Sequence, residues 1–462
     1  MFKKIPHTYV IIFYIILLAA ILTWIIPGGE YKRTVMETNG VERTVIDKDS
    51  FQFVERNVQS WHIFSALFKG FEKQAGIIVF ILLIGGAFWI MNASKAIDVG
   101  IMAFLKFTKK LEHLRLIRFL GVNNIIIVLV MVLFSVFGAV FGMSEETIAF
   151  IIIIVPLAIS MGYDSIVGVC MVYVAAHLGF AAAVLNPFTI GIAQGIANLP
   201  LFSGIEYRIF CWFVINTIGI SWVLWYARRI KARPERSPMF KLDEFWRKRG
   251  NTTVENVVYE TSGMAWFTYF FILAGLILFS IGFPQTEMTI GNSSAAFPAV
   301  PIATTVFALA GALSLRKSAH FFILNLLAFT IVFLIIGVMG YGWYIMEIAT
   351  LFFAMGIFSG MAMNNSANQI THLFLDGVKD ILSAAMVVGL AGGILVILED
   401  GKIIDTILYS VSRSMAGLGK IGTVSVMYVI QTFINVIIPS GSAKAALTMP
   451  VMAPFSDLVN LS

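Results

Sequence analysis

Long apolar runs dominate the chain, and short polar or charged stretches separate them. Many runs reach about 20 residues, the length at which a helix crosses the hydrocarbon of a bilayer. They lack the ten-residue segments of alternating polarity that mark membrane β-barrels. The pattern therefore predicts an all-α polytopic membrane protein. The predicted spans are about 8–27, 75–94, 119–138, 165–185, 206–227, 264–283, 298–315, 319–339, 343–361, 381–398 and 421–438.

Composition agrees with this class. Of the 462 residues, 59% are hydrophobic and 13% are charged, and the mean hydropathy is +0.88. We assign the net charge of +6 to basic loops beside the membrane and expect no nucleic-acid partner. Cys170 and Cys211 both lie inside apolar runs and are predicted to be small core residues. No HExxH motif, nucleophile elbow or phosphate-binding glycine loop is present, so we do not expect an enzyme.

The charge of the loops predicts the orientation of the spans. Residues 95–118 hold six Lys/Arg against two acids, and residues 228–249 hold nine against three, which favours the cytoplasmic side. Residues 28–60 are balanced, and residues 284–297 have no Lys or Arg, which favours the outside. The basic N-terminus precedes an apolar run of about twenty residues, so we expect a retained first span rather than a cleaved signal peptide.

Two stretches interrupt the regular spans. Adjacent carboxylates, Glu145 and Glu146, stand between apolar segments, and the second segment soon ends at Pro156. A charge at the bilayer centre costs roughly 2.5–3.5 kcal/mol on insertion scales, so both should face protein or water. We predict a re-entrant hairpin at about 139–161.

The second interruption lies at Asn186-Pro187, where an apolar run of full length stops. A single crossing over 164–204 would place the basic loop that starts at Arg228 outside the cell. We therefore expect 187–203 to form a separate thin crossing. The alternative is one broken helix.

An internal repeat relates the two halves of the chain. GGAFWIMNASKAID (85–98) matches GGILVILEDGKIID (392–405) at an offset of 307, which Gly70 and Gly377 keep. FGMSEETIAFIIIIVP (141–156) matches PSGSAKAALTMPVMAP (439–454) at an offset of 298. Ser144 then corresponds to Ser442, and Glu146 to Lys444. Such duplications are common in secondary transporters, usually as inverted repeats.

The repeat divides the chain into predicted regions. Each copy should contain a re-entrant hairpin and a broken helix, but the second copy stops soon after its hairpin. We expect the second repeat to be incomplete and the chain to be a shortened form. The regions are a first span with an external loop (1–60), repeat one (61–228), a basic cytoplasmic loop (229–262), connecting spans (263–361) and repeat two (362–462, hairpin about 438–458).

These motifs resemble those of a known family. PHTYVIIFYIILLAAILTWIIPGGEYKR, GMSEETIAF, NPFTIGIAQ, GGILVILEDGKIIDTIL and IIPSGSAKAALTMPVMAP together are similar to the YfcC-like carriers. This family belongs to the C4-dicarboxylate anaerobic carrier-like group, is related to arginine/ornithine antiporters and falls within the ion-transporter superfamily. The resemblance covers nearly the whole chain. It implies a multi-pass protein of the bacterial inner membrane, two inverted repeats, two hairpins and an elevator-type movement.

The resemblance also implies a substrate site, because related families bind substrate between the hairpin tips and the helix breaks. A homodimer is compatible with the sequence, and no cofactor is expected. The implied substrate-binding positions are Ser144, Glu145, Glu146, Thr147, Asn186, Thr189, Ser440, Ser442 and Lys444.

The residue types at these positions suit a small charged ligand. A carboxylate could bind Lys444, and an ammonium could bind Glu146, which favours an amino acid over a C4-dicarboxylate. Ser144, Asn186 and Ser442 are candidate Na⁺ ligands, and a buried carboxylate could instead carry a coupled proton. The structural alternative is that Glu146 and Lys444 only pair and hold the hairpins together.

Other polar residues are predicted to be structural. His177 lies in mid-span, where a packed, hydrogen-bonded role is expected ahead of a proton relay. Glu347 should lie at an interface, and Asn364 should lie in a loop or at a helix end. Asp98 and Asp405 should anchor the ends of their spans. The sequence therefore predicts a secondary carrier, most simply for amino acids, by exchange or coupled to H⁺ or Na⁺. A C4-dicarboxylate carrier is the alternative.

Overall fold

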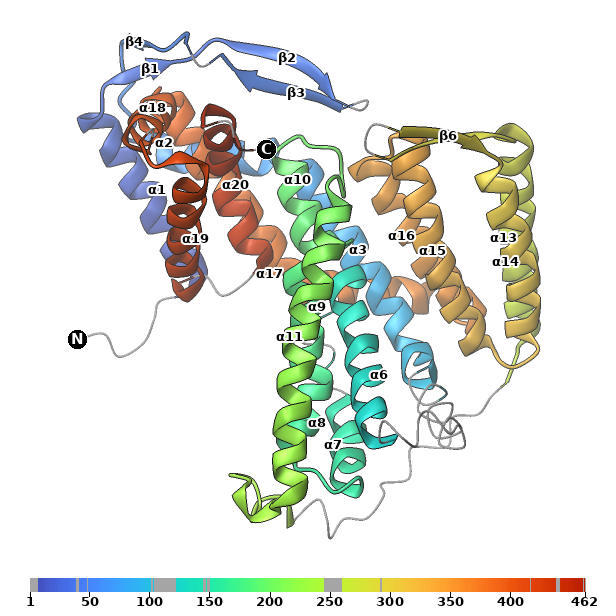
Figure 1. Ribbon diagram of the computed structural model, residues 1–462. Coiled ribbons are helices and arrows are strands. Elements are labelled where there is room, and N and C mark those ends of the chain that lie inside the picture. The colour runs from blue at the N-terminus through green and yellow to red at the C-terminus, as the bar shows by residue number, and fades with distance from the viewer. Residues whose placement is uncertain are drawn as a thin grey trace.

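The computed structural model describes residues 7–38, 41–47, 49–100, 103, 122–143, 147, 150–244, 260–290, 293–415, 417–437, 441–459 and 461. Within these residues the chain is almost entirely helical (Figure 1). Nine helices among them are long and apolar enough to cross a membrane. The predicted polytopic helical class is therefore confirmed.

The first half of the chain supplies several candidate spanning helices, an amphipathic helix and the elements around the predicted break. The helices are α1 (Thr8–Ile25), α2 (His62–Lys73), α3 (Ala75–Ala93), α6 (Val122–Val136), α7 (Ile151–Ser160), α8 (Ser165–Val169), α9 (Ala175–Ala182), α10 (Ile192–Ile196) and α11 (Ile205–Ala232). π-helical turns η2 (Phe137–Phe141), η4 (Cys170–Val174) and η5 (Pro187–Gly191) join several of them, and a short 3₁₀ turn, η6 (Pro234–Arg236), follows α11.

The second half begins with four regular helices and ends with the predicted second repeat. The helices are α13 (Gly263–Gly282), α14 (Ala299–Leu315), α15 (Ala319–Tyr341), α16 (Ile345–Ala362), α17 (Ala367–Asp400), α18 (Ile404–Met415), α19 (Gly419–Ile437) and α20 (Gly441–Leu458). Asn364 lies between α16 and α17, and Glu347 Oε2 accepts the Tyr344 N–H at the start of α16. Both residues therefore have the helix-end places expected of them.

Short antiparallel strand pairs close one end of the molecule. They are β1 (Gly28–Glu30) with β4 (Gln52–Val54), β2 (Arg33–Thr38) with β3 (Val41–Ile46), and β5 (Thr286–Ile290) with β6 (Ser293–Phe297). Figure 1 shows them at the end opposite the turn that follows α11. The strands come from the loops with balanced or no basic charge, and that turn belongs to the loop rich in Lys and Arg.

The residues from 165 to 196 form one broken helix rather than two crossings. They make a single candidate span of 32 residues, and α8, α9 and α10 follow one another beside α11 in Figure 1. The expectation that 187–203 crosses separately was therefore wrong. It treated a helix break as a change of direction, whereas the chain resumes its course after Pro187.

In the segment before this broken helix, the start of α6 lies next to the end of α7. Asn123 Nδ2, at the start of α6, donates a hydrogen bond of 3.2 Å to the Met161 carbonyl just after α7. The start of α6 and the end of α7 are thus side by side. The re-entrant hairpin predicted at about 139–161 would run from η2 to just after α7, and it stays a prediction. With ten residues, α7 is about 15 Å long, half the thickness of the hydrocarbon core.

The repeated glycines meet across the two copies. A Cβ atom on Gly70 of α2 would lie 2.2 Å from the Gly393 nitrogen, and its other neighbours are the backbones of Gly389 and Gly392. A Cβ on Gly377 of α17 would lie 2.8 Å from the Gly85 oxygen and from the Gly86 Cα. Each lone glycine therefore packs into the glycine pair of the other copy. No larger residue fits either crossing.

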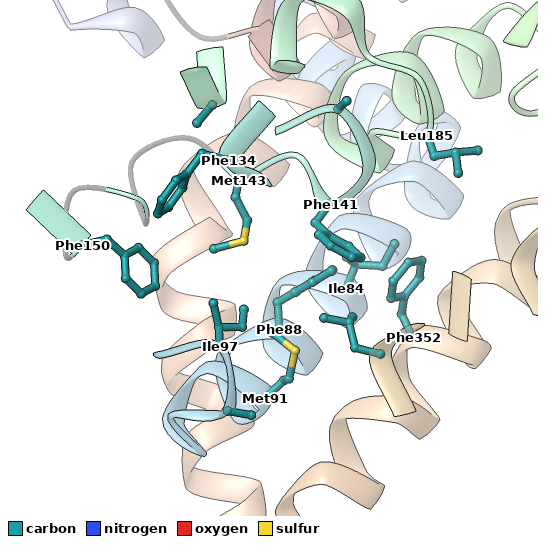
Figure 2. Packing of buried hydrophobic residues seen from close by; sticks show 14 of the residues in the cluster. Ile84, Phe88, Met91, Ile97, Phe134, Phe141, Met143, Phe150, Leu185 and Phe352 are labelled. Carbon is teal, nitrogen blue, oxygen red and sulfur yellow. The ribbon is translucent and has the colours of Figure 1, made fainter. Parts of the chain in front are cut away.

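The main core lies around α3, α6, α9 and α15, and a second core joins α1, α17, α18 and α20. Figure 2 shows part of the main core, in which aromatic and sulfur-containing side chains such as Phe88, Phe141 and Met143 gather. Each cluster therefore combines helices from both halves of the chain, and α17 contributes to both clusters.

Candidate functional site

The break in the 165–196 helix has a defined local structure. α9 ends where Ala183 adopts a left-handed conformation (φ 46°), and the helix resumes at Pro187. Asn186 caps the new segment, because its Oδ1 accepts the Phe188 N–H at 2.9 Å. Proline suits the first helical position, since its missing N–H would be unpaired there in any case. The Asn-Pro pair thus ends one helix and starts the next.

The backbone entering the Ser-Glu-Glu segment passes directly over this break. η2 ends at Phe141, and Gly142 follows in the left-handed region (φ 69°). A Cβ on Gly142 would lie 2.4 Å from Asn186 Oδ1 and 2.8 Å from the Phe188 ring. The Leu185 N–H also donates to the Ala139 carbonyl at 2.9 Å. Glycine is therefore required here by conformation and by space.

Helix α20 begins against the same break from another direction. A Cβ on Gly441, the first residue of α20, would lie 3.3 Å from Thr189 Cγ2 and 3.2 Å from the Phe180 ring. α20 continues toward the end of the molecule that carries the strands, and α7 lies toward the other end (Figure 1). Segments separated by about 300 residues in the sequence thus meet at Asn186 to Thr189.

Two buried polar atoms at the break have no partner within the described residues. They are Asn186 Nδ2 and Thr189 Oγ1, and the whole Asn186 side chain is 0% exposed. An unpaired buried donor or acceptor costs about 1–3 kcal/mol. One Asn186 atom holds the local backbone, and the other is available to a ligand. Thr189 adds a hydroxyl on the side of Gly441.

Three of the remaining predicted site residues lie within the described part of the chain. Lys444 lies in the first turn of α20, is half-buried and donates from Nζ to Asn435 Oδ1 of α19 at 3.2 Å. Thr147 is fully buried. Ser442 lies in the same turn as Lys444. The predicted residues that lie outside the described part are Ser144, Glu145, Glu146 and Ser440.

The expected pairing of Glu146 with Lys444 accordingly stays a prediction. No cluster of three or more His, Cys, Asp or Glu side chains occurs within the described ranges. Asn186 Nδ2 is a donor and suits an acceptor group of a substrate. The Thr189 hydroxyl can accept from a substrate or ligate a hard cation, and neither group is a typical transition-metal ligand.

A group of phenylalanine rings packs beside the break, and the sequence did not indicate it. Phe88 of α3 lies 6.3 Å from both Phe141 and Phe188, measured between ring centroids, and 5.4 Å from Phe352 of α16. Figure 2 shows Phe88, Phe141 and Phe352 turned toward one another. Phenylalanine is common throughout this chain, so only the fold shows which rings adjoin the site.

Residues expected to be structural make structural contacts. Asp405 is buried and accepts from Arg33 at 2.6 and 2.9 Å and from the Tyr31 N–H at 2.9 Å. Its counterpart Asp98 makes a looser pair of 3.8 Å with Lys95. The two aspartates therefore have unequal roles as anchors, which the repeat alone did not predict.

Comparison with known proteins relates nearly the whole chain to one family. Residues 5–462 match the model of the DcuC family, C4-dicarboxylate anaerobic carriers. The chain is 30% identical over 497 residues to YfcC of Escherichia coli (strain K12), whose name proposes that it is a basic amino acid antiporter; the match covers 99% of this chain and 84% of the relative. An uncharacterized Haemophilus influenzae protein is 27% identical with the same coverage.

Solved structures show a similar fold at low sequence identity. The Alcanivorax borkumensis YdaH transporter matches with a TM-score of 0.54 and 13% identity, over 99% of this chain and 84% of that one. Neisseria gonorrhoeae MtrF, described among antimetabolite efflux pumps, matches with a TM-score of 0.54 and 14% identity, over 98% and 81%. These likenesses concern the fold alone.

Proposed function

This chain belongs to the C4-dicarboxylate anaerobic carrier family, and from this premise we propose that it is a secondary active transporter of amino acids. The observation that carries the proposal is the convergence at the helix break. Asn186 and Thr189 offer two polar atoms that have no partner among the described residues, and they lie between Gly142 and Gly441, the backbones that lead into the two predicted hairpin tips. We place substrate binding there.

The charges that adjoin this point favour a zwitterion. Lys444 lies one turn beyond Gly441, and Glu145 and Glu146 follow Gly142 within four residues. A substrate carboxylate would bind Lys444 and the Asn186 amide, and an ammonium would bind the glutamates. A cationic side chain would find a second carboxylate in the same pair, which suits a basic amino acid. Charge-assisted hydrogen bonds of this kind are about twice as strong as neutral ones.

An inverted repeat with re-entrant hairpins would explain the architecture. Gly70 packs into Gly392-Gly393 while Gly377 packs into Gly85-Gly86, as expected if a pseudo-two-fold axis exchanges the copies. Lys95 and Lys402, which correspond at the same offset, both have left-handed backbones, with φ of 60° and 57°. The second limbs, α7 and α20, point to opposite ends of the molecule (Figure 1).

Such an arrangement supports an elevator-type movement in a bacterial inner membrane. A site held by hairpin tips and a broken helix can be carried as one body past the remaining helices. The nine candidate spans and the basic loop after α11 fit a multi-pass protein with that loop in the cytoplasm. Exchange, proton coupling and Na⁺ coupling are all compatible with Asn186 and Thr189 as polar ligands.

A C4-dicarboxylate is the second candidate, because the family is described by that substrate. Lys444 and the Asn186 amide could bind one carboxylate. The second carboxylate would meet Glu145 or Glu146 unless one of the groups were protonated. The amino acid therefore fits the charge pattern better.

Counterflow in proteoliposomes tests the proposal. Vesicles preloaded with unlabelled arginine, ornithine, a neutral amino acid or succinate are diluted into labelled substrate. We expect saturable entry with a basic amino acid and no competition by succinate. Competition by succinate alone would establish the dicarboxylate candidate instead.

Two substitutions test the site. Lys444→Met should weaken substrate affinity by roughly 10- to 150-fold, the equivalent of about 1.5–3 kcal/mol for a hydrogen bond to a charged group. Asn186→Leu should abolish binding. Lys420→Met, an exposed lysine at the start of α19, is the matched control and should leave affinity unchanged. If Lys444→Met lowered only thermal stability and left affinity intact, Lys444 would have a structural role.

A further inference from the structure

His177 is the ionisable side chain that α9 carries in the middle of the broken helix, and its position is specific. The helix enters α9 through the π-helical turn Cys170–Val174, and such turns occur frequently at functional sites. The ring packs on Tyr173 with 4.1 Å between centroids. His177 Nδ1 lies 2.8 Å from the Tyr173 carbonyl oxygen.

This contact determines which nitrogen carries the proton. A carbonyl oxygen only accepts hydrogen bonds, so Nδ1 must be the protonated donor. In the neutral ring, Nε2 is then left as an acceptor with a free lone pair. Protonation at Nε2 adds a positive charge without breaking the bond to Tyr173. The ring can thus gain and lose a proton while keeping its orientation.

A single side chain, that of Phe180, separates His177 from the proposed substrate site. Its ring centroid is 6.4 Å from that of Phe180, and the Phe180 ring is the atom group nearest to Gly441, at 3.2 Å from a Cβ placed there. Both rings are only partly buried. The imidazole therefore borders the place where α20 meets the helix break.

Among the described residues, the elements around this ring carry few other charged groups, and Glu145 and Glu146 lie outside the described part. Its own helix contributes Tyr173 and Cys170, and α6 with η2 has no ionisable side chain. α11 contributes Cys211, which lies away from the helix ends. The start of α11 carries Glu206, Tyr207 and Arg208, and its end carries Tyr226, Arg228, Arg229 and Lys231. α20 contributes Lys444, with Asp457 at its far end. A proton on His177 would thus add a positive charge beside the start of α20.

We propose that His177 carries the proton that is exchanged for a cationic substrate. The inference rests on the proposed amino acid transport. A protonated His177 repels a second cation at the adjoining site, so the proton and the substrate bind in alternation. Because the protein holds either the proton or the cation, each transport cycle carries one cation in one direction and one proton in the other. The chain would then be an antiporter of protons and basic amino acids.

Proton-driven accumulation tests this directly. Wild-type proteoliposomes with an acidic interior should accumulate labelled basic amino acid, and the rate of accumulation should depend on pH. His177→Asn keeps an amide donor for the Tyr173 carbonyl but has no group equivalent to Nε2. It should lose at least 10-fold in accumulation driven by pH and have a flat pH profile, with substrate counterflow retained.

Controls separate the two proposals. His372→Asn, at an exposed position on α17, should behave as the wild type. Retained counterflow shows that the His177→Asn protein is folded and binds substrate. Accumulation driven by an acidic exterior, or an unchanged pH profile in His177→Asn, would overturn the role of His177. Absence of counterflow in the wild type would instead overturn the proposed transport of amino acids.

Discussion

The helices α6 and α19 have matching places in the internal repeat but very different surroundings. At the positions offset by 298, Ile126, Val130, Met131 and Ser135 of α6 are at most 5% exposed. Their counterparts on α19 are open: Val424 and Val429 are each 51% exposed, Tyr428 72% and Phe433 70%. Helices α9 and α11 cover α6, whereas α20 packs on α19. The same apolar pattern therefore serves a core in one copy and an open face in the other.

The comparison shows that the neighbours of a membrane helix decide its burial. Both helices are apolar along their length, because lipid and protein interior favour the same side chains. Packing leaves a different mark, which is the presence of small residues. α6 and the turn η2 that follows it meet α9 through Gly179 and Gly138, where a Cβ would lie 1.8 and 1.9 Å from backbone carbonyl oxygens. On α19 the residues matching Ser135 and Gly138 are Phe433 and Val436.

The largest effect is expected at this close contact. Gly179→Leu would force α6 and α9 apart, because the new side chain would overlap the Ser135 carbonyl. The loss should exceed the ~5 kcal/mol at which single substitutions are exceptional, so the protein should not fold. Phe433→Leu, at the α19 counterpart of Ser135, should change the unfolding free energy by less than about 0.5 kcal/mol. Gel filtration and thermal unfolding in detergent measure both, and a folded Gly179→Leu protein would contradict the close packing.

A pair of truncations sharpens the contrast between buried and open faces. Met131→Ala should cost about 2–5 kcal/mol, because it leaves a cavity in the core. Val429→Ala, at the matching position, removes an exposed side chain and should cost less than about 0.5 kcal/mol. Denaturation monitored by tryptophan fluorescence gives both values. Equal losses would mean that α19 is covered by protein in the membrane.

The two repeated aspartates give a smaller difference. Asp405→Ala should destabilise the protein by about 1–3 kcal/mol, because Arg33 and the Tyr31 N–H lose their acceptor. Asp98→Asn should be neutral or slightly stabilising. Burial raises the pKa of the Asp98 carboxyl, with Lys95 opposing the shift. Thermal unfolding of both variants at neutral pH checks the ranking, and an Asp98→Asn protein as unstable as Asp405→Ala would contradict it.

The pH dependence of the Asp98 effect has a definite sign. A raised pKa means that the folded state binds the proton more tightly than the unfolded state does. The contribution of Asp98 to stability is therefore largest at low pH and falls as the pH rises toward its raised pKa. Asp98→Asn should remove this fall. A pH series of unfolding temperatures that is steeper in Asp98→Asn than in the wild type would show the opposite sign.

Much of the helical architecture could be predicted from the sequence, because spans follow apolar length. The ends of α1, α3, α13 and α15 lie close to the predicted limits. The course of the chain after Pro187 could not be predicted, since a broken helix and a turn share the same residues. The count of crossings then misled the interpretation, because it took 119–138 as a full span although the start of α6 lies beside the end of α7. The π turns were also invisible, because they depend on packing rather than on composition.

Only part of the candidate site could be predicted from the sequence. Asn186 and Thr189 were identified from the break, and the repeat drew attention to the segments that begin near Gly142 and Gly441. The contact of Gly142 with Asn186 required coordinates, because it joins residues through space with no periodic signal. The place of His177 beside Phe180 also required them, since a lone histidine in an apolar run carries no indication of its neighbours.

The exchange of glycine contacts between the copies has a consequence for biogenesis. Gly70 cannot reach its final neighbours until Gly392 and Gly393 have been synthesised. At ~5–20 residues per second, a ribosome needs roughly 15–60 s to add those three hundred or so residues. During that delay the glycine backbones of α2 and α3 lack the α17 residues that later pack on them. Maturation of the first copy therefore waits for the second, and a translation pause before residue 367 would prolong exposure to membrane proteases.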